Sequence, residues 1–190
     1  MSDMSASKDP GPRQRLIASA QRLTATQGVG VGVDAILEDA SVARRSLYQH
    51  FGGKDALIAE SLRESAATDE ARYVAAMDAA GEAPRDRILA VIDGLDLLVT
   101  SPRFRGCPYV SAEVSLPEPG HPAHAVIHEY TRRLQALFTA ELTKLGHRDP
   151  EQGAAQILVL IDGILVVGAL LPGSHPGRTV RPLVESILDS

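Results

Sequence analysis

The side chains best suited to contact another molecule are concentrated between residues 42 and 57. Two adjacent arginines, Arg44 and Arg45, begin a short polar segment, Arg-Arg-Ser-Leu-Tyr-Gln-His-Phe, which ends at a pair of glycines. An arginine can donate two hydrogen bonds to one guanine, and phosphate contacts fix the register of a reading helix. Lys54 follows the glycines at the start of a new helical segment, where free backbone N–H groups also favour a phosphate. This pattern predicts a helix that reads DNA, whereas a solvated charge pair would leave the aromatic residues and the Gly-Gly-Lys-Asp ending unexplained.

The predicted DNA contacts combine readers of base edges with anchors on the phosphate backbone. Leu47 and Phe51 are expected to point inward and hold the helix, which leaves the other side chains of the segment free. Residues 10–54 contain six basic and three acidic side chains, although the whole chain has a net charge of −5. A local positive charge of this kind suits a DNA-binding head on an acidic body. The predicted contacts are Arg13, Arg44, Arg45, Ser46, Tyr48, Gln49, His50 and Lys54.

The spacing of apolar residues predicts an all-α fold of about nine helices. Glycine, proline and capping residues place the helix ends, and residues 103–120 contain three prolines that limit any helix there to a short or kinked one. Only the short run from residue 29 to residue 33 alternates like a strand. The glycines of that run follow a helix and have no phosphate-binding lysine nearby, so a nucleotide-binding loop is not expected. Besides the short or kinked helix within residues 103–120, the predicted helices span residues 11–27, 33–40, 44–50, 54–80, 85–100, 121–145, 151–171 and 179–188.

The segment from residue 42 to residue 57 resembles the recognition helix and following turn of the TetR family of bacterial repressors. The resemblance is specific over residues 11 to 60, and it implies a helix-turn-helix head at residues 11–54 and a ligand-binding and dimerisation body at residues 55–190. Residues 1–10 are expected to form a disordered arm. Three positions depart from the family pattern: Ser41 stands where the turn usually has glycine, and Ala43 and Gly32 stand where a serine or threonine usually caps a helix. Each missing cap is expected to cost about 1 kcal/mol.

The resemblance implies a repressor that leaves a palindromic operator when a small, largely apolar molecule binds the body. Gly106-Cys107-Pro108 resembles a step found in one branch of TetR-like bodies, where it would bend a helix beside the pocket. Asp93, Asp96 and Asp162 stand out in apolar helices, and the Asp162-Gly163 step, which resembles one in TetR-like bodies, is interpreted as structural or interface-related. The residues predicted to line the pocket are Leu95, Leu98, Val99, Phe104, Cys107, Tyr109, Val110, Glu113, His124, Ile127 and His128.

Two sensor variants of the same fold remain open from the sequence. Cys107 is the single cysteine, and Arg103 and Arg105 lie near it, so a thiol sensor is conceivable beside the simpler role of a small buried hydrophobe. His121, His124 and His128 fall on one helical face and could present imidazoles to a metal ion, with Glu113 joining them. Ordinary roles explain these histidines better, with His121 at a helix N-terminus and the others in the pocket or on the surface, and no metal or cofactor is predicted.

The DNA-reading interpretation requires a two-fold dimer, because half-sites lie about one helical turn apart. The most apolar stripes near the C-terminus are predicted to pack as a four-helix bundle between two copies, although they could also face only the subunit's own core. The predicted interface residues are Ile157, Ile161, Ile164, Gly168, Leu171, Val180, Leu183, Val184 and Ile187.

Composition excludes several other classes of protein. One cysteine rules out an internal disulfide framework, and the most apolar stretch, residues 157–171, is short and contains Asp162, so it is expected to be a buried helix. The N-terminal residues show no apolar signal-peptide core, so a cytoplasmic location is expected. An enzyme would need a nucleophile–base pair or a cofactor motif, and a structural helical dimer would leave Arg44, Arg45 and Lys54 without a role. Neither alternative accounts for the sequence as well as a DNA-binding regulator.

Overall fold

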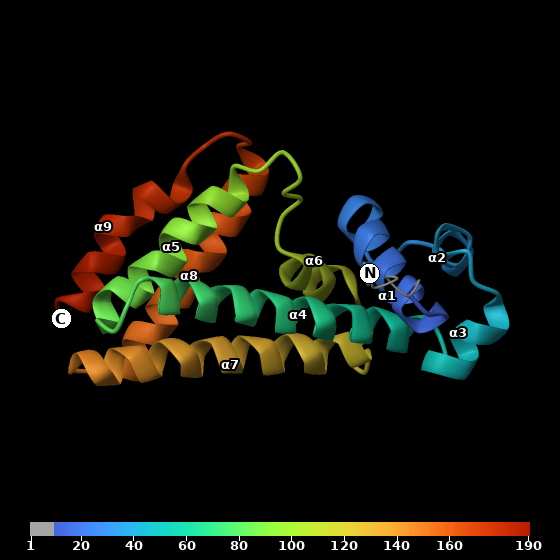
Figure 1. Cartoon of the computed structure of the whole chain (residues 1–190), viewed down its shortest axis with the longest axis horizontal. Coiled ribbons are helices and arrows are strands. Elements are labelled where there is room, and N and C mark those ends of the chain that lie inside the picture. The colour runs from blue at the N-terminus through green and yellow to red at the C-terminus, as the bar shows by residue number, and fades with distance from the viewer. Residues whose placement is uncertain (1–9) are drawn as a thin grey trace, which may run out of the picture.

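The computed structural model describes residues 10–190, so the predicted N-terminal arm lies outside the described residues except for Pro10. Within that range the chain is helical throughout, which confirms the all-α prediction. The elements run from a small head at one end to a larger body at the other (Figure 1). The helices are α1 Pro12–Gln27, α2 Val33–Ala40, α3 Arg44–Phe51, α4 Lys54–Ala79, α5 Pro84–Val99, α6 Pro108–Ser115, α7 Pro122–Leu145, α8 Pro150–Leu170 and α9 Pro176–Leu188.

The head consists of α1, α2 and α3 packed against the first turns of α4. Leu16, Ile36 and Leu47 are fully buried, one from each of the three helices, and Leu57 of α4 is fully buried with them. The apolar face of each short helix is too small to be stable alone, so their shared contact with α4 supplies the core. The head therefore includes the start of α4 and extends beyond the boundary predicted at residue 54.

The turn between α2 and α3 has the strain and the missing caps that the sequence predicts. Ser41 is the only non-glycine residue among residues 10–190 with a positive φ, at 51°. No side chain caps α2 at Gly32 or α3 at Ala43. Val42 lies in the turn and is buried, and its backbone N–H donates to the Leu37 carbonyl at 3.0 Å. The turn is therefore stabilised by the burial of Val42, and not by capping side chains.

The body is built around two long helices, α4 and α7, which pack along each other (Figure 1). Helices α5, α8 and α9 pack on one another, and α5 and α8 also pack on α7, which completes a helical bundle. The prolines at 108, 117 and 119 confine α6 to eight residues, as the sequence predicts, and α6 packs on α7. The long connector α4 thus begins in the head and ends in the body.

Helix α8 is apolar on two faces, and only one of them lies in the core. An 18-residue window of this 21-residue helix has a mean hydropathy of 2.1, which would suffice to cross a membrane by length and composition. One face packs into the bundle, and the other exposes Val159, Val166 and Leu170 with relative accessibilities of 71%, 41% and 72%. The expectation of a buried helix therefore holds for one face of α8 only.

The dimer-interface prediction is corrected by this arrangement. The exposed members of the predicted set are Leu171 and Leu183, and Val180 and Ile187 are half-buried. The sequence could not distinguish the two faces because both are apolar, and the isoleucine stripe is the one that packs on the subunit's own helices. The predicted interface residues that are buried in the subunit's own core are Ile157, Ile161, Ile164, Gly168 and Val184.

Candidate functional site

Helix α3 presents a polar surface on a buried apolar support. Leu47 is fully buried and locks the helix to the head, whereas Tyr48 is 55% exposed. Arg45, Gln49 and His50 are also exposed, and Ser46 is half-buried. The structure therefore places the predicted DNA contacts of α3 on a solvent-facing side, and it places Leu47 inward as the sequence predicts.

The two arginines of α3 differ in their partners. The Arg44 guanidinium forms an ion pair with Asp34 of α2. Arg45 forms no ion pair or side-chain hydrogen bond with any of residues 10–190. Arg45 can thus bind a ligand without losing an existing contact, whereas Arg44 must first break its ion pair with Asp34.

Arg13 joins the head to α4. Its guanidinium pairs with Glu60 and with Glu64, the latter at 3.2 Å, and lies 5.7 Å from the centre of the Phe51 ring. Gln14 donates to the same Glu64 at 3.0 Å. The sequence predicted Arg13 as a DNA contact, and the structure adds a role in holding α1 on α4. Lys54, by contrast, is the first residue of α4 and has no ion-pair partner among residues 10–190.

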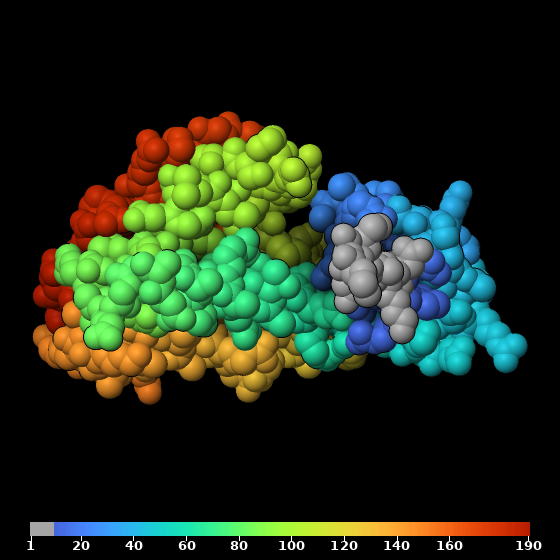
Figure 2. Space-filling view, viewed as in Figure 1, coloured from blue at the N-terminus to red at the C-terminus, as the bar shows by residue number. Residues whose placement is uncertain are grey.

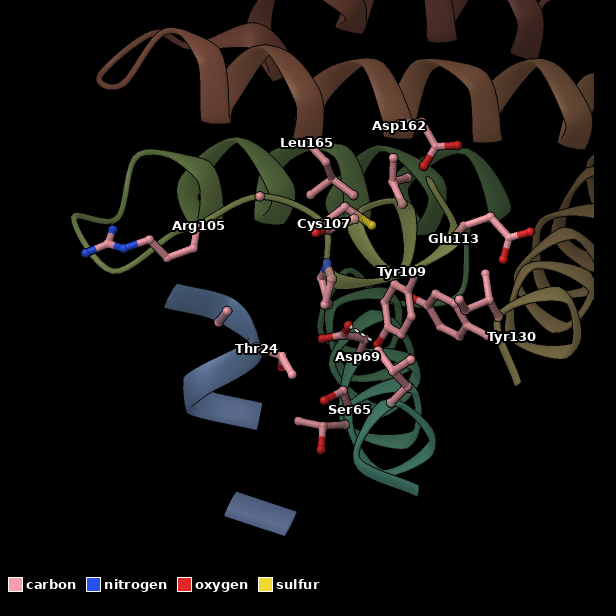
Figure 3. A pocket seen from close by; sticks show the side chains of 18 of the residues that line it. Thr24, Ser65, Asp69, Arg105, Cys107, Tyr109, Glu113, Tyr130, Asp162 and Leu165 are labelled. Carbon is pink, nitrogen blue, oxygen red and sulfur yellow. Dashed lines mark hydrogen bonds between the residues drawn. The ribbon is translucent and has the colours of Figure 1, made fainter. Parts of the chain in front are cut away.

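A cavity with a volume of about 760 Å³ lies between the head and the body. It is bounded by α4, the segment from residue 101 to residue 107, α6, α7 and α8, and also by α1 of the head (Figure 3). In the space-filling view a hollow opens between the blue head and the yellow-green segment that follows α5 (Figure 2). A space of this size can hold a drug-sized molecule.

The structure brings most of the predicted pocket residues to this cavity. Leu95 and Val99 lie elsewhere because they face the core of the bundle, where Val99 packs against Gly168. His124 does not line the cavity either, although its ring is hydrogen-bonded to Glu113, and the prediction is corrected for these three residues. The predicted residues that do line the cavity are Leu98, Phe104, Cys107, Tyr109, Val110, Glu113, Ile127 and His128.

A cluster of tyrosines around one carboxylate forms the polar part of the cavity wall. The Tyr109 hydroxyl donates to the Asp69 carboxylate at 2.7 Å, and the rings of Tyr109 and Tyr130 lie 4.2 Å apart (Figure 3). Burial raises the pKa of Asp69, and burial together with the Asp69 charge raises the pKa of Tyr73 to about 12. The cluster therefore offers neutral hydroxyls beside aromatic faces, which suits a molecule with both polar and apolar parts.

Sequence reasoning missed a large part of this wall. Asp69 and Tyr73 lie on α4, which the sequence presents only as a connector, and Tyr130 lies on α7 near the predicted Ile127. Asp162, which the sequence suggests is structural or at an interface, lines the cavity instead. The one available signal was the presence of three tyrosines, out of four in the chain, in helices predicted to form the body.

The surroundings of Cys107 and of the histidines do not favour a thiol sensor or a metal site. Burial raises the pKa of the Cys107 thiol, which opposes thiolate formation. Glu113 accepts a hydrogen bond from His124 Nδ1 at 2.8 Å and lies 3.1 Å from His128 Nε2. The hydrogen bond with His124 lowers the pKa of Glu113 and raises that of His124. His121 acts as the N-cap of α7, and no group of three metal-ligating side chains is arranged for a metal within residues 10–190.

Comparison with known proteins identifies the fold and the family. The model of bacterial regulatory proteins of the tetR family matches residues 16–61. A crystal structure of a TetR transcriptional regulator from Streptomyces avermitilis is 33% identical in sequence, with a TM-score of 0.84 over 95% of this chain and 97% of that chain. The chain belongs to the TetR family. A TetR-family regulator from Streptomyces coelicolor is similar at 30% identity and a TM-score of 0.86, over 94% of each chain.

Curated relatives agree with this membership. The HTH-type transcriptional regulator YjdC of Escherichia coli strain K12 is 25% identical over 93% of each chain. The HTH-type transcriptional regulator BetI of Burkholderia thailandensis is 26% identical over 93% of this chain and 91% of its own. This TetR-family protein is therefore a DNA-binding transcriptional regulator and not an enzyme.

Proposed function

We propose that this TetR-family regulator is a repressor that leaves a palindromic operator when a small organic molecule binds between head and body. The observation that carries the proposal is the cavity of about 760 Å³, whose walls include both α4 of the body and α1 of the head. A molecule bound there stabilises the position of the head to which it binds most tightly. If that position differs from the one that fits the operator, the molecule lowers the affinity for DNA.

In the proposed complex α3 lies in the major groove of the operator. Arg45 reads a guanine, since it is exposed and has no side-chain partner among residues 10–190, and Gln49 lies one turn along the same helix. Tyr48, His50 and Lys54 bind phosphates on either side of the groove. Arg44 also contacts a base, but it must break its ion pair with Asp34 to do so. Its contact is therefore the weaker of the two arginine contacts.

The proposed homodimer forms through the exposed apolar faces of α8 and α9. Val159, Val166 and Leu170 follow one another along α8 at helical spacing, and Leu183 of α9 is 55% exposed. Gly163 lies between them, and a Cβ added there would meet no atom within 4 Å, so a partner helix can approach closely. A second copy would cover this surface and form a four-helix bundle from two helices of each chain.

The proposed effector is mostly apolar with at least one hydrogen-bonding group. Leu158, Ile161 and Leu165 provide apolar wall on α8, opposite the tyrosines and Asp69. The raised pKa of Cys107 and the engagement of Glu113 by two histidines favour an organic effector over a thiol or metal signal. Because the operator is chromosomal DNA of a bacterial regulator, we place the protein in the cytoplasm.

The test begins with a duplex selected from a random-sequence pool by the wild-type protein, and with a library of small organic molecules. A molecule that raises the melting temperature of the wild type should also release the selected duplex. It should do neither with Cys107→Trp, which fills the cavity, and it should do both with Leu97→Trp, which adds the same ring at a site 71% exposed and outside the cavity. If every stabilising molecule acts equally on Cys107→Trp, the cavity is not the effector site.

A further inference from the structure

The cavity has one wall that belongs to the DNA-reading head itself. Gln21, Thr24 and Ala25 of α1 and Val29 of the following loop line it, and Figure 3 shows Thr24 facing the space from the α1 side. Across the cavity lies the segment from residue 101 to residue 107 of the body. Head and body thus meet across an open space here and not across a packed core.

At this end Ser19 and Arg22 hold α1 to Asp39 of α2 within the head, and few polar contacts join α1 to the rest of the protein. The Gln21 amide donates to the Ser61 carbonyl at 3.2 Å and to Ser65 Oγ at 3.0 Å, and these bonds join α1 to α4 beside the cavity. Among residues 10–190 no hydrogen bond or ion pair joins α1 to residues 100–115. The opposite end of α1 is held more firmly, since Arg13 pairs with two glutamates of α4. The cavity end of α1 therefore faces the 101–107 segment without a hydrogen bond or ion pair to it among residues 10–190, so a molecule bound between them can shift this end without breaking a bond to that segment.

We propose that the effector touches the head directly, as a spacer between the C-terminal half of α1 and the 101–107 segment, and so sets the head position by its own size. This inference rests on the proposed function and specifies its regulation. A molecule that contacts both walls has a different binding free energy at each head position, and that difference is what couples its binding to DNA binding. A molecule confined to the body would act only through α4.

The chemistry of the head wall indicates which part of the effector lies there. Gln21 and Thr24 contribute an amide and a hydroxyl, and Ser65 of α4 adds a second hydroxyl beside them. None of these groups is charged. The effector is therefore expected to present a neutral hydrogen-bonding group to the head, with its apolar part toward α8.

The experiment places a small group on the head wall by covalent attachment. In a Cys107→Ser background, Ala25→Cys supplies one thiol on the cavity side of α1, and Thr26→Cys supplies one on exposed α1 surface outside the cavity. Monobromobimane alkylates each thiolate, with loss of bromide, and mass spectrometry confirms complete labelling. The affinity for the selected duplex is then measured for labelled and unlabelled protein, with the melting temperature and the dimer checked in each.

Bimane at residue 25 should weaken DNA binding about tenfold or more, within the usual range of coupling between sites, while bimane at residue 26 leaves it unchanged. No effect at residue 25, or an equal effect at both positions, overturns the inference. Labelling of Cys107 in the wild type distinguishes the two proposals. Release by bimane at Cys107 without release at residue 25 leaves the proposed function standing and removes direct contact with the head, whereas no release at either residue argues against both.

Discussion

The carboxylate of Asp96 allows a sharp test of how α9 is held on the body. Asp96 is 6% exposed on α5 and accepts hydrogen bonds from the Gly177 backbone N–H at 2.9 Å and from His175 Nδ1 at 2.8 Å. No side chain of α9's own N-terminal turn caps that helix. Asp96 therefore caps α9 from a neighbouring helix, and its negative charge lies at the positive end of the helix dipole.

The cost of removing this carboxylate follows from those contacts. In Asp96→Ala the buried Gly177 N–H loses its acceptor, which costs about 1–3 kcal/mol, while the more exposed His175 regains water at little cost. The lost interaction with the helix dipole adds up to about 1 kcal/mol. We expect a loss of about 3 kcal/mol in the free energy of unfolding, or a fall of roughly 6–12 °C in melting temperature for a chain of this size.

A matched control is available on the same pair of helices. Asp93 of α5 pairs with Arg181 of α9 at 2.5 and 2.6 Å, but both side chains are substantially exposed. An exposed pair contributes about 1 kcal/mol or less, so Asp93→Ala should lower the melting temperature much less than Asp96→Ala. Both variants are compared with wild type by thermal melting at one protein concentration. If Asp93→Ala proves as destabilising as Asp96→Ala, burial is not what gives Asp96 its weight and the reasoning is refuted.

Three further outcomes are expected. Gly168→Ala should cost about 1–3 kcal/mol in urea unfolding, because its Cβ would lie 2.5 Å from Val99 Cβ; an unchanged midpoint would show that the helices can separate there. Leu170→Glu should convert the dimer to a folded monomer in size-exclusion chromatography, and a persistent dimer would place the interface elsewhere. The hydrogen bond to Glu113 raises the pKa of His124. The interaction between the two side chains therefore stabilises the fold fully below pH 6.5, the ordinary pKa of His124, and this stabilisation is lost as the pH rises through the raised pKa. The stability difference between wild type and Glu113→Gln should therefore shrink as the pH rises above about 6.5, and a growing difference would contradict the assigned sign.

Much of the fold was predictable because local signals mark its helix ends. Gly28 and Gly146 adopt positive φ angles at the ends of α1 and α7, and proline stands in the first turn of α7 and of α8. The inward positions of Leu47 and Phe51 followed from helical spacing alone. These features depend on a few neighbouring residues, which a sequence displays directly.

The parts that the sequence could not predict depend on contacts between distant segments. Helix α8 has two apolar faces, and only the positions of α5, α7 and α9 decide that Ile157 faces inward and Val159 outward. The head wall of the cavity brings Ala25 toward residues 101–107, which are far away in the chain. The ion pairs of Arg13 with Glu60 and Glu64 likewise depend on the packing of α1 on α4. The charge of Arg13 alone therefore did not show that it holds these two helices together.

The most direct test of the account is the affinity of Arg45→Ala for the duplex selected by the wild-type protein. Loss of one arginine–guanine pair costs about 1–3 kcal/mol, and a dimer carries two, so binding should weaken by at least about 30-fold. Arg132→Ala removes an exposed arginine from α7 of the body and should leave the affinity unchanged. Equal affinity of Arg45→Ala and wild type, with the dimer intact, would contradict the claim that α3 reads the operator.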